Sequence, residues 1–174
     1  MHHNDSYIPH RMPRSAAILA ALALAALPAA TSARTSDERA LWATVNACDT
    51  ITHPNVIGIR GSMPGADNTR EQMYMRFKVQ FFNARRQEWH NISKGGDSGF
   101  ISVGPAKFKA RQAGQLFTFA PPTGATFKLR GKVIFQWRLG KKVIRSVSRI
   151  TTAGHHSNSG SDPEGYSSDT CLIS

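Results

Sequence analysis

The sequence predicts an all-β domain, a single antiparallel β-sandwich of two sheets, which follows an N-terminal signal-peptide helix. Beyond residue 33, apolar residues recur at every second position through most of the chain, which is the period of strands with one buried face. Gly- and Pro-rich turn signals separate about seven such segments at intervals of roughly ten to twenty-five residues, a spacing typical of two-sheet sandwiches.

The start of the chain has the three parts of a cleavable secretory signal. Arg11 and Arg14 precede an apolar run over residues 16–30 that carries no charge, and the small residues that a signal peptidase accepts follow it. The run is about fifteen residues long, whereas a membrane-spanning helix needs about 20. We therefore expect cleavage after Ser32 or Ala33 rather than an uncleaved membrane anchor, and no membrane span in the remaining chain.

This pattern predicts a signal peptide over residues 1–33 and one β-sandwich domain over residues 34–174. The remaining chain, about 140 residues, is long enough for one hydrophobic core and too short for two. Residues 154–174 form a tail rich in Ser and Gly, a composition that by itself is typical of disorder. We expect the mature protein to be secreted to the extracellular space or retained in the cell envelope.

The strands expected first along the chain differ in clarity. Residues 37–45 fit either a strand or a short helix capped by Ser36. The clearest alternation lies in residues 73–82, with two sets on opposite faces: Met73, Met75, Phe77, Val79 and Phe81 on one, and Arg76, Lys78 and Gln80 on the other. Weaker alternation predicts further strands over residues 55–60, 88–92, 99–103 and 115–119.

Residues 129–139 and 142–151 are expected to form a β-hairpin with a tight turn at Gly140. The first of these strands has a buried set, which consists of Leu129, Val133, Phe135, Trp137 and Leu139, opposite a polar set, which consists of Arg130, Lys132, Gln136 and Arg138. In the second strand Ile144 and Ile150 are out of phase with Val143 and Val147. This irregularity predicts a β-bulge or a position at the edge of the sheet.

The chain has two cysteines, Cys48 and Cys171, near opposite ends of the predicted domain. Outside the cytosol an even pair most often forms a disulfide, and closing so long a loop contributes on the order of 5 kcal/mol. A zinc site has little support, because neither cysteine has a second one nearby. We therefore predict a disulfide that tethers the tail to the domain.

Several segments carry a resemblance to a known group of proteins. They are LRGKVIFQWRLGKKVI, TTAGHH and DPEGYSSDTC between residues 129 and 171, and Cys48-Asp49, IGIRGSMPG (residues 57–65) and Met75-Arg76-Phe77 upstream. Together they resemble small secreted proteins of high-GC Gram-positive bacteria. The resemblance implies an immunoglobulin-like or fibronectin-III-like β-sandwich and an exported location. This group brings no established activity, so the resemblance implies no function.

The segment Gly96-Asp97-Ser98-Gly99 resembles the nucleophile loop of chymotrypsin-like serine proteases. His53 and Asp67 precede it in the order that such a triad uses. The surroundings of His53 do not fit, Phe100 replaces a glycine, and the chain is too short for two barrels. Because this composition is also common in turns, we predict a turn and no catalytic residue, with a secreted hydrolase as the alternative.

His155 and His156 are a second candidate for chemistry, with Asp162 and Glu164 close behind them. Adjacent side chains on an extended chain point to opposite sides, and the spacing matches no standard zinc or calcium loop. We predict a solvated loop and neither metal nor cofactor, with a weak metal-binding protein as the alternative.

The chain is strongly basic, with 22 Lys and Arg against 11 Asp and Glu and a formal net charge of +11. Such an excess favours anionic partners. The candidate anion-binding residues are the cations of the predicted hairpin: Arg130, Lys132 and Arg138 on the outward face, and Lys141, Lys142, Arg145 and Arg149 at its turn and flank. An ordinary solvated face, or an edge strand protected from aggregation, would explain the same residues.

Aromatic residues do not interleave with these cations in the hairpin sequence, since Phe135 and Trp137 are in phase with the buried set. The hairpin therefore lacks the stacking platforms of single-strand binders, and we expect no specific nucleic-acid binding. Trp89 fits either the core or an exposed contact. The sequence thus favours a monomeric, non-catalytic binding or structural module that engages an anionic envelope polymer or a protein partner through a basic strand face.

Overall fold

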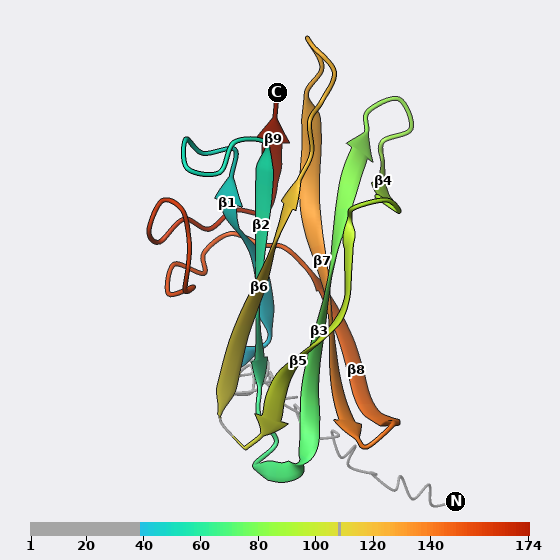
Figure 1. The fold of residues 1–174 in the computed structure, drawn as a ribbon, viewed down its shortest axis with the longest axis vertical. Helices are drawn as coiled ribbons and strands as arrows, with labels where there is room; N and C mark the ends of the chain where they lie inside the picture. The colour runs from blue at the N-terminus through green and yellow to red at the C-terminus, as the bar shows by residue number, and fades with distance from the viewer. Residues whose placement is uncertain (1–38, 108) are drawn as a thin grey trace, which may run out of the picture. The chain divides into compact units, whose positions relative to one another are not determined.

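The computed structural model describes residues 39–107 and 109–174, so the signal peptide predicted over residues 1–33 lies outside the described part. The described residues form nine strands in two antiparallel sheets that pack face to face (Figure 1). The predicted all-β sandwich is therefore confirmed. No helix among the described residues has the length and apolar character needed to span a membrane.

The smaller sheet has three strands in the order β1-β2-β6. These are β1 (Trp42–Cys48), β2 (Val56–Pro64) and β6 (Ala110–Thr118). The chain leaves this sheet after β2 and returns to it at β6, an alternation between sheets that is characteristic of immunoglobulin-like sandwiches.

The larger sheet has six strands, and β3 (Asn68–Asn83) and β7 (Phe127–Leu139) pair at its centre. Two strands pair in succession with the other edge of β3, namely β5 (Asp97–Ala106) and β4 (Glu88–Asn91). Two more share the far edge of β7, namely β8 (Lys142–Ile150) and β9 (Cys171–Ile173).

The core lies between the sheets and is built from alternate residues of the two central strands. The expected inward residues are no more than 2% exposed: Met73, Met75, Phe77 and Val79 of β3, and Leu129, Val133, Phe135 and Trp137 of β7. Met75 is paired with Phe135 and Phe77 with Val133, so their side chains lie together on one face. The sequence-based assignment of these faces is confirmed, except at the ends of the two strands. Leu139, expected in the buried set of β7, is 46% exposed beside the hairpin turn. Phe81 of β3 is 37% exposed and lines an apolar cleft with Phe119 and Phe127.

Two glycines allow the sheets to approach each other closely. A Cβ atom added to Gly131 of β7 would lie 2.7 Å from a methyl carbon of Thr151 and 2.8 Å from one of Ile59. A Cβ atom on Gly61 of β2 would lie 3.1 Å from the ring of Phe135. Side chains of one sheet therefore rest directly on the backbone of the other.

Several element boundaries differ from the sequence-based expectation. The first strand covers Trp42–Cys48 rather than 37–45, and residues 39–40 before it are helical. The short strand β9 was not predicted, because three residues are too few to show a period. The irregular strand β8 lies at the sheet edge, and its pairing with β7 shifts register between Trp137 and Arg138. Both explanations offered for its imperfect alternation are therefore confirmed.

The C-terminal tail folds back over the smaller sheet as a strap, which we define as residues 152–170. Its backbone pairs with the free edge of β1: Val45 N donates to the Ser168 carbonyl at 2.9 Å, and Ser168 N donates to the Val45 carbonyl at 3.1 Å. Further along, Asp162 N donates to the Asn46 carbonyl at 2.8 Å. Tyr166 of the strap packs against the core.

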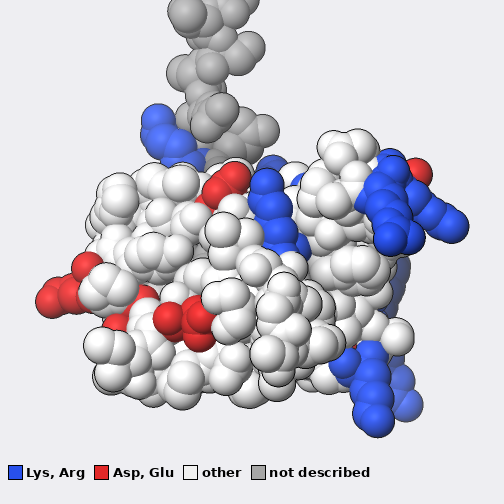
Figure 2. Space-filling view, turned by 90° about the horizontal axis from the view of Figure 1, so that it is seen from above, with Lys and Arg blue, Asp and Glu red and all other residues white. Residues whose placement is uncertain are grey.

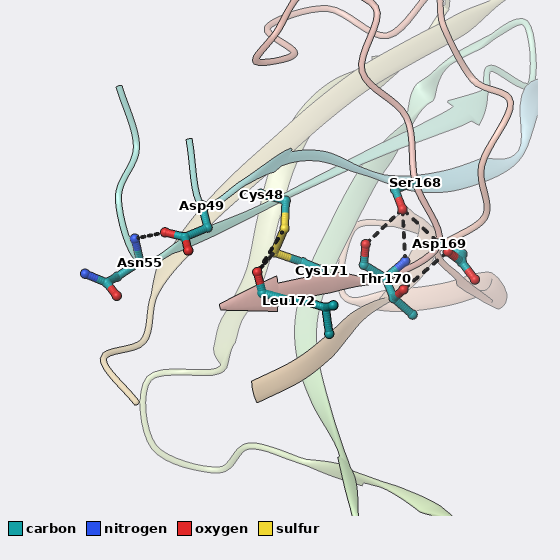
Figure 3. Close-up of a disulfide and its surroundings, with 8 residues drawn as sticks. All are labelled: Cys48, Asp49, Asn55, Ser168, Asp169, Thr170, Cys171 and Leu172. Carbon is teal, nitrogen blue, oxygen red and sulfur yellow. Dashed lines mark hydrogen bonds between the residues drawn. A yellow bond between two sulfur atoms is a disulfide. The ribbon is translucent and has the colours of Figure 1, made fainter. Parts of the chain in front are cut away.

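The strap ends at the predicted disulfide between Cys48 and Cys171, whose Cα atoms are 5.4 Å apart (Figure 3). The bridge joins the end of β1 to the start of β9 and so connects the two sheets at one end of the sandwich. The prediction that Cys171 tethers the tail is confirmed.

Candidate anion-binding face

The outward side of the larger sheet carries cations and aromatic rings side by side. Residues paired directly across antiparallel strands share a face of the sheet. The pairs Arg76–Phe100, Lys78–Lys132 and Phe82–Trp89 therefore place cationic and aromatic side chains on the same face. We call this surface the cation–aromatic face. It consists of Tyr74, Arg76, Lys78 and Phe82 of β3, Trp89 of β4, Phe100 of β5, and Lys128, Arg130, Lys132 and Arg138 of β7.

The guanidinium groups of this face lie over its rings. The Arg138 guanidinium carbon is 4.2 Å from the centroid of Tyr74 and 4.4 Å from that of Phe100. Arg130 lies 4.2 Å from the centroid of Trp89 in the same way. These distances fall within the range of attractive cation–π contacts. The two arginine side chains are therefore held in place while their heads stay at the surface.

Hydrogen bonds position the Arg130 head further. Its Nε donates to Gln80 Oε1 at 2.8 Å, and Gln80 Nε2 donates to Asn91 Oδ1 at 3.0 Å. Partial burial of the guanidinium lowers the pKa of Arg130 by desolvation. An acceptor that reaches this arginine would therefore interact with a charge that is partly removed from water.

Asp97 is the one carboxylate that strand pairing places among these cations in the described part of the chain. Arg76 donates to it twice, at 2.7 Å from Nε and 2.6 Å from Nη2, and Lys78 Nζ lies 3.4 Å away. The hydrogen bond from Arg76 is the main reason that the pKa of Asp97 falls from 3.8 to about 2. The six cations of the face thus keep a large positive excess.

Asp97 predicts a pH dependence of stability. Because its pKa in the folded protein is lowered from 3.8 to about 2, its contribution is present above about pH 4 and is lost as the pH falls towards 2. We expect Asp97→Asn to flatten the dependence of the free energy of unfolding on pH in that window, measured by urea denaturation at each pH. Asp67→Asn, which removes a carboxylate from a turn, is the control and should keep the wild-type slope. Equal slopes for Asp97→Asn and wild type would contradict the assignment.

The structure places the predicted basic residues of the hairpin in three different positions. Arg130, Lys132 and Arg138 share the outward face of β7, and Lys141 and Lys142 are exposed at the hairpin turn.

Arg145 and Arg149 do not flank that face as predicted. They are paired with Trp137 and Val133, so they lie on the inward side of β8. Arg145 lies over the Trp137 ring, 4.6 Å from its centroid. The register shift between Trp137 and Arg138 explains the difference. It adds one residue to β8 after the turn, so the side chains beyond it point to the opposite face from the one that regular alternation predicts.

Sequence reasoning missed the aromatic half of the face. The alternation in residues 73–82 already placed Arg76 and Lys78 outward, and Tyr74 and Phe82 have the same phase. Trp89, which fitted either environment, is half-buried beneath Arg130. The hairpin itself carries no outward ring, as expected, since Phe135 and Trp137 are buried. The rings beside its cations come from β3, β4 and β5.

The protease-like residues are engaged elsewhere. The Ser98 hydroxyl accepts a hydrogen bond from Phe77 N at 2.9 Å and donates to the Gly99 carbonyl at 2.7 Å. His53 Nδ1 lies 2.8 Å from the Asp162 carboxylate rather than near Asp67. Hydrogen bonds from Thr50, Thr52 and His53 lower the pKa of Asp162 to about 2. No hydrogen bond joins Ser98 to His53 in the described residues.

The two adjacent histidines have separate partners. The His155 ring stacks on Trp42 with centroids 4.5 Å apart, and its Nε2 lies 3.1 Å from the Thr152 hydroxyl. His156 Nδ1 lies 2.8 Å from the Gly165 carbonyl oxygen. Burial, and to a lesser extent the neighbouring His156, lower the pKa of His155. Within residues 39–107 and 109–174, no three His, Cys, Asp or Glu side chains gather as metal ligands would.

Charge is distributed unevenly over the molecule. Figure 2 looks at one end of the sandwich, and most of the visible Lys and Arg lie on the right, the side of β3, β4 and β8 in Figure 1. Most of the visible Asp and Glu lie on the left, the side of β1 and the strap.

The fold and this face together define an antiparallel two-sheet β-sandwich with one basic, aromatic-lined broad side. No family model and no curated protein matches the chain. Its resemblance to secreted proteins of high-GC Gram-positive bacteria therefore stays a prediction.

Proposed function

We propose that this protein is a secreted or envelope-associated, non-catalytic binding module that holds an acidic glycan on the cation–aromatic face. The observation that carries the proposal is the stacking of Arg130 and Arg138 over half-buried rings. The planar guanidinium group of arginine can bind carboxylates and phosphates through two N–H groups at once. Because stacking already restrains these two side chains, binding of a ligand costs less side-chain conformational entropy.

The extent of the face favours a polymer over a single small ion. Its cations run along β7 from Lys128 to Arg138, a length of roughly 33 Å at about 3.3 Å per residue. A chain of acidic sugars offers charges repeated over such a distance, and the exposed parts of Tyr74 and Trp89 offer apolar surface to sugar rings. An exported location is supported by the N-terminal apolar segment and by the disulfide, which is typical of oxidising compartments.

The double variant Arg130→Gln/Arg138→Gln tests this proposal. We expect its affinity for alginate, a polyuronate, to be at least about tenfold lower than that of wild type at low salt, because both stacked guanidinium groups are lost. Wild-type affinity should itself fall about tenfold or more between about 50 and 200 mM NaCl, since binding releases counterions. Biolayer interferometry with immobilised alginate measures both effects.

Lys141→Gln/Lys142→Gln is the matched control, because it removes the same charge from the hairpin turn and should bind almost as wild type does. Equal losses in the two double variants would show that net charge alone governs binding. Absence of alginate binding by wild type at low salt would refute the proposal. Tighter binding to a single-stranded oligonucleotide than to alginate would reassign the face to nucleic acid.

A further inference from the structure

Arg60 of β2 is a half-buried cation on the opposite broad side of the molecule, the side that the strap covers. Its Nε is buried and has no hydrogen-bond partner, and no ion pair to Arg60 forms among the described residues. Burial lowers the pKa of this guanidinium by desolvation. Buried charges are normally paired, so this partly buried, unpaired guanidinium is a candidate anion site.

Two glycines make room for the Arg60 guanidinium itself. A Cβ atom on Gly160 of the strap would lie 2.6 Å from Arg60 Nη2, and one on Gly114 of β6 would lie 3.2 Å from Nε. Beside the guanidinium is a cavity of about 210 Å³, which Asn46, His53 and Gly160 also line. A cavity of this volume has room for a small ion.

Hydrogen bonds fix the walls of this cavity. Asn46 Nδ2 donates to the Gly160 carbonyl at 2.7 Å, which holds the strap against β1. On the other side, His53 Nδ1 bonds to Asp162, and its Nε2 has no hydrogen bond within the described residues. The Asp162 carboxylate is itself occupied by Thr50, Thr52 and His53.

We propose that this cavity binds a small oxyanion of the phosphate or sulfate class. The Arg60 guanidinium is the charged ligand, and its planar fork can hold two oxygens of one anion. The side chains of Asn46 and His53 line the same cavity. The site lies on the opposite side of the sandwich from the cation–aromatic face, so it does not depend on the glycan proposal.

Titration with inorganic phosphate at constant ionic strength tests the site. We expect a saturable change of the Arg60 Nε–Hε resonance in the NMR spectrum of the wild-type protein and a rise in its Tm. Arg60→Gln should weaken phosphate binding at least about tenfold. Lys141→Gln, which removes an exposed charge at the hairpin turn, should leave it unchanged. Parallel titrations with sulfate and acetate distinguish a tetrahedral oxyanion from a carboxylate.

Two results would overturn the proposal: an Arg60 resonance that does not respond to phosphate at millimolar concentration, or an Arg60→Gln protein that binds phosphate as tightly as wild type. The NMR titration uses the wild-type protein, so it tests phosphate binding at Arg60 even if Arg60→Gln does not fold. A response to acetate but not to phosphate or sulfate would likewise contradict the assigned ligand class.

Discussion

Replacing Cys48 and Cys171 together by alanine is expected to lower the free energy of unfolding by about 5 kcal/mol. The bridge joins residues 123 positions apart, and so long a loop greatly restricts the unfolded chain. Typical domains have only about 5–15 kcal/mol of stability in total, so the variant should be close to unfolded at physiological temperature. Denaturation in guanidinium chloride, followed by tryptophan fluorescence, measures the loss.

Dithiothreitol provides the control for the bridge. It should lower the denaturation midpoint of the wild-type protein towards that of the double variant and leave the variant unaffected. A midpoint that stays the same after the bridge has been reduced would show that the strap and β9 hold their places without it.

Replacing Phe135 by alanine is expected to cost about 3–5 kcal/mol of stability, the range for a large aromatic side chain removed from a core. Phe135 is fully buried, and its ring rests on Gly61 of the opposite sheet. Its removal therefore leaves a cavity at the interface of the two sheets, where neighbouring backbone segments cannot easily collapse into it. Urea denaturation gives the change in the free energy of unfolding.

The neighbouring residue offers a matched comparison. Ile134 is adjacent on β7 but points to the outward face and is half-exposed, so Ile134→Ala should cost less than about 1 kcal/mol. Similar costs for the two variants would contradict the assignment of the two faces of β7.

The core could be predicted from the sequence because its signal is local. A period of two in residues 73–82 and 129–139 assigns each side chain to a face without any knowledge of the partner strands. The assignment failed at Phe81 and Leu139, near the ends of their strands, where the side chains are 37% and 46% exposed. At Phe81 the same phase leads to an open cleft instead of the core.

The candidate site could be predicted only in part, because it depends on pairing between distant strands. Arg138 meets Tyr74 and Phe100 only after β7, β3 and β5 have come together. Arg60 is enclosed only once Gly160 of the strap has folded back over β2. No local pattern encodes either contact, whereas the outward phase of Arg130 and Arg138 was readable from one strand.

The position of the disulfide also affects what a protease can do to this molecule. The hairpin turn at Gly140 and the turn at Gly124 are exposed, and exposed loop tips are preferred cleavage sites. Both lie between Cys48 and Cys171, so a single cut at either turn leaves two fragments joined by a covalent bond. Because strands on both sides of the cut remain paired within the same sheets, a nicked molecule can keep its fold, and the fragments separate only when the bridge is reduced.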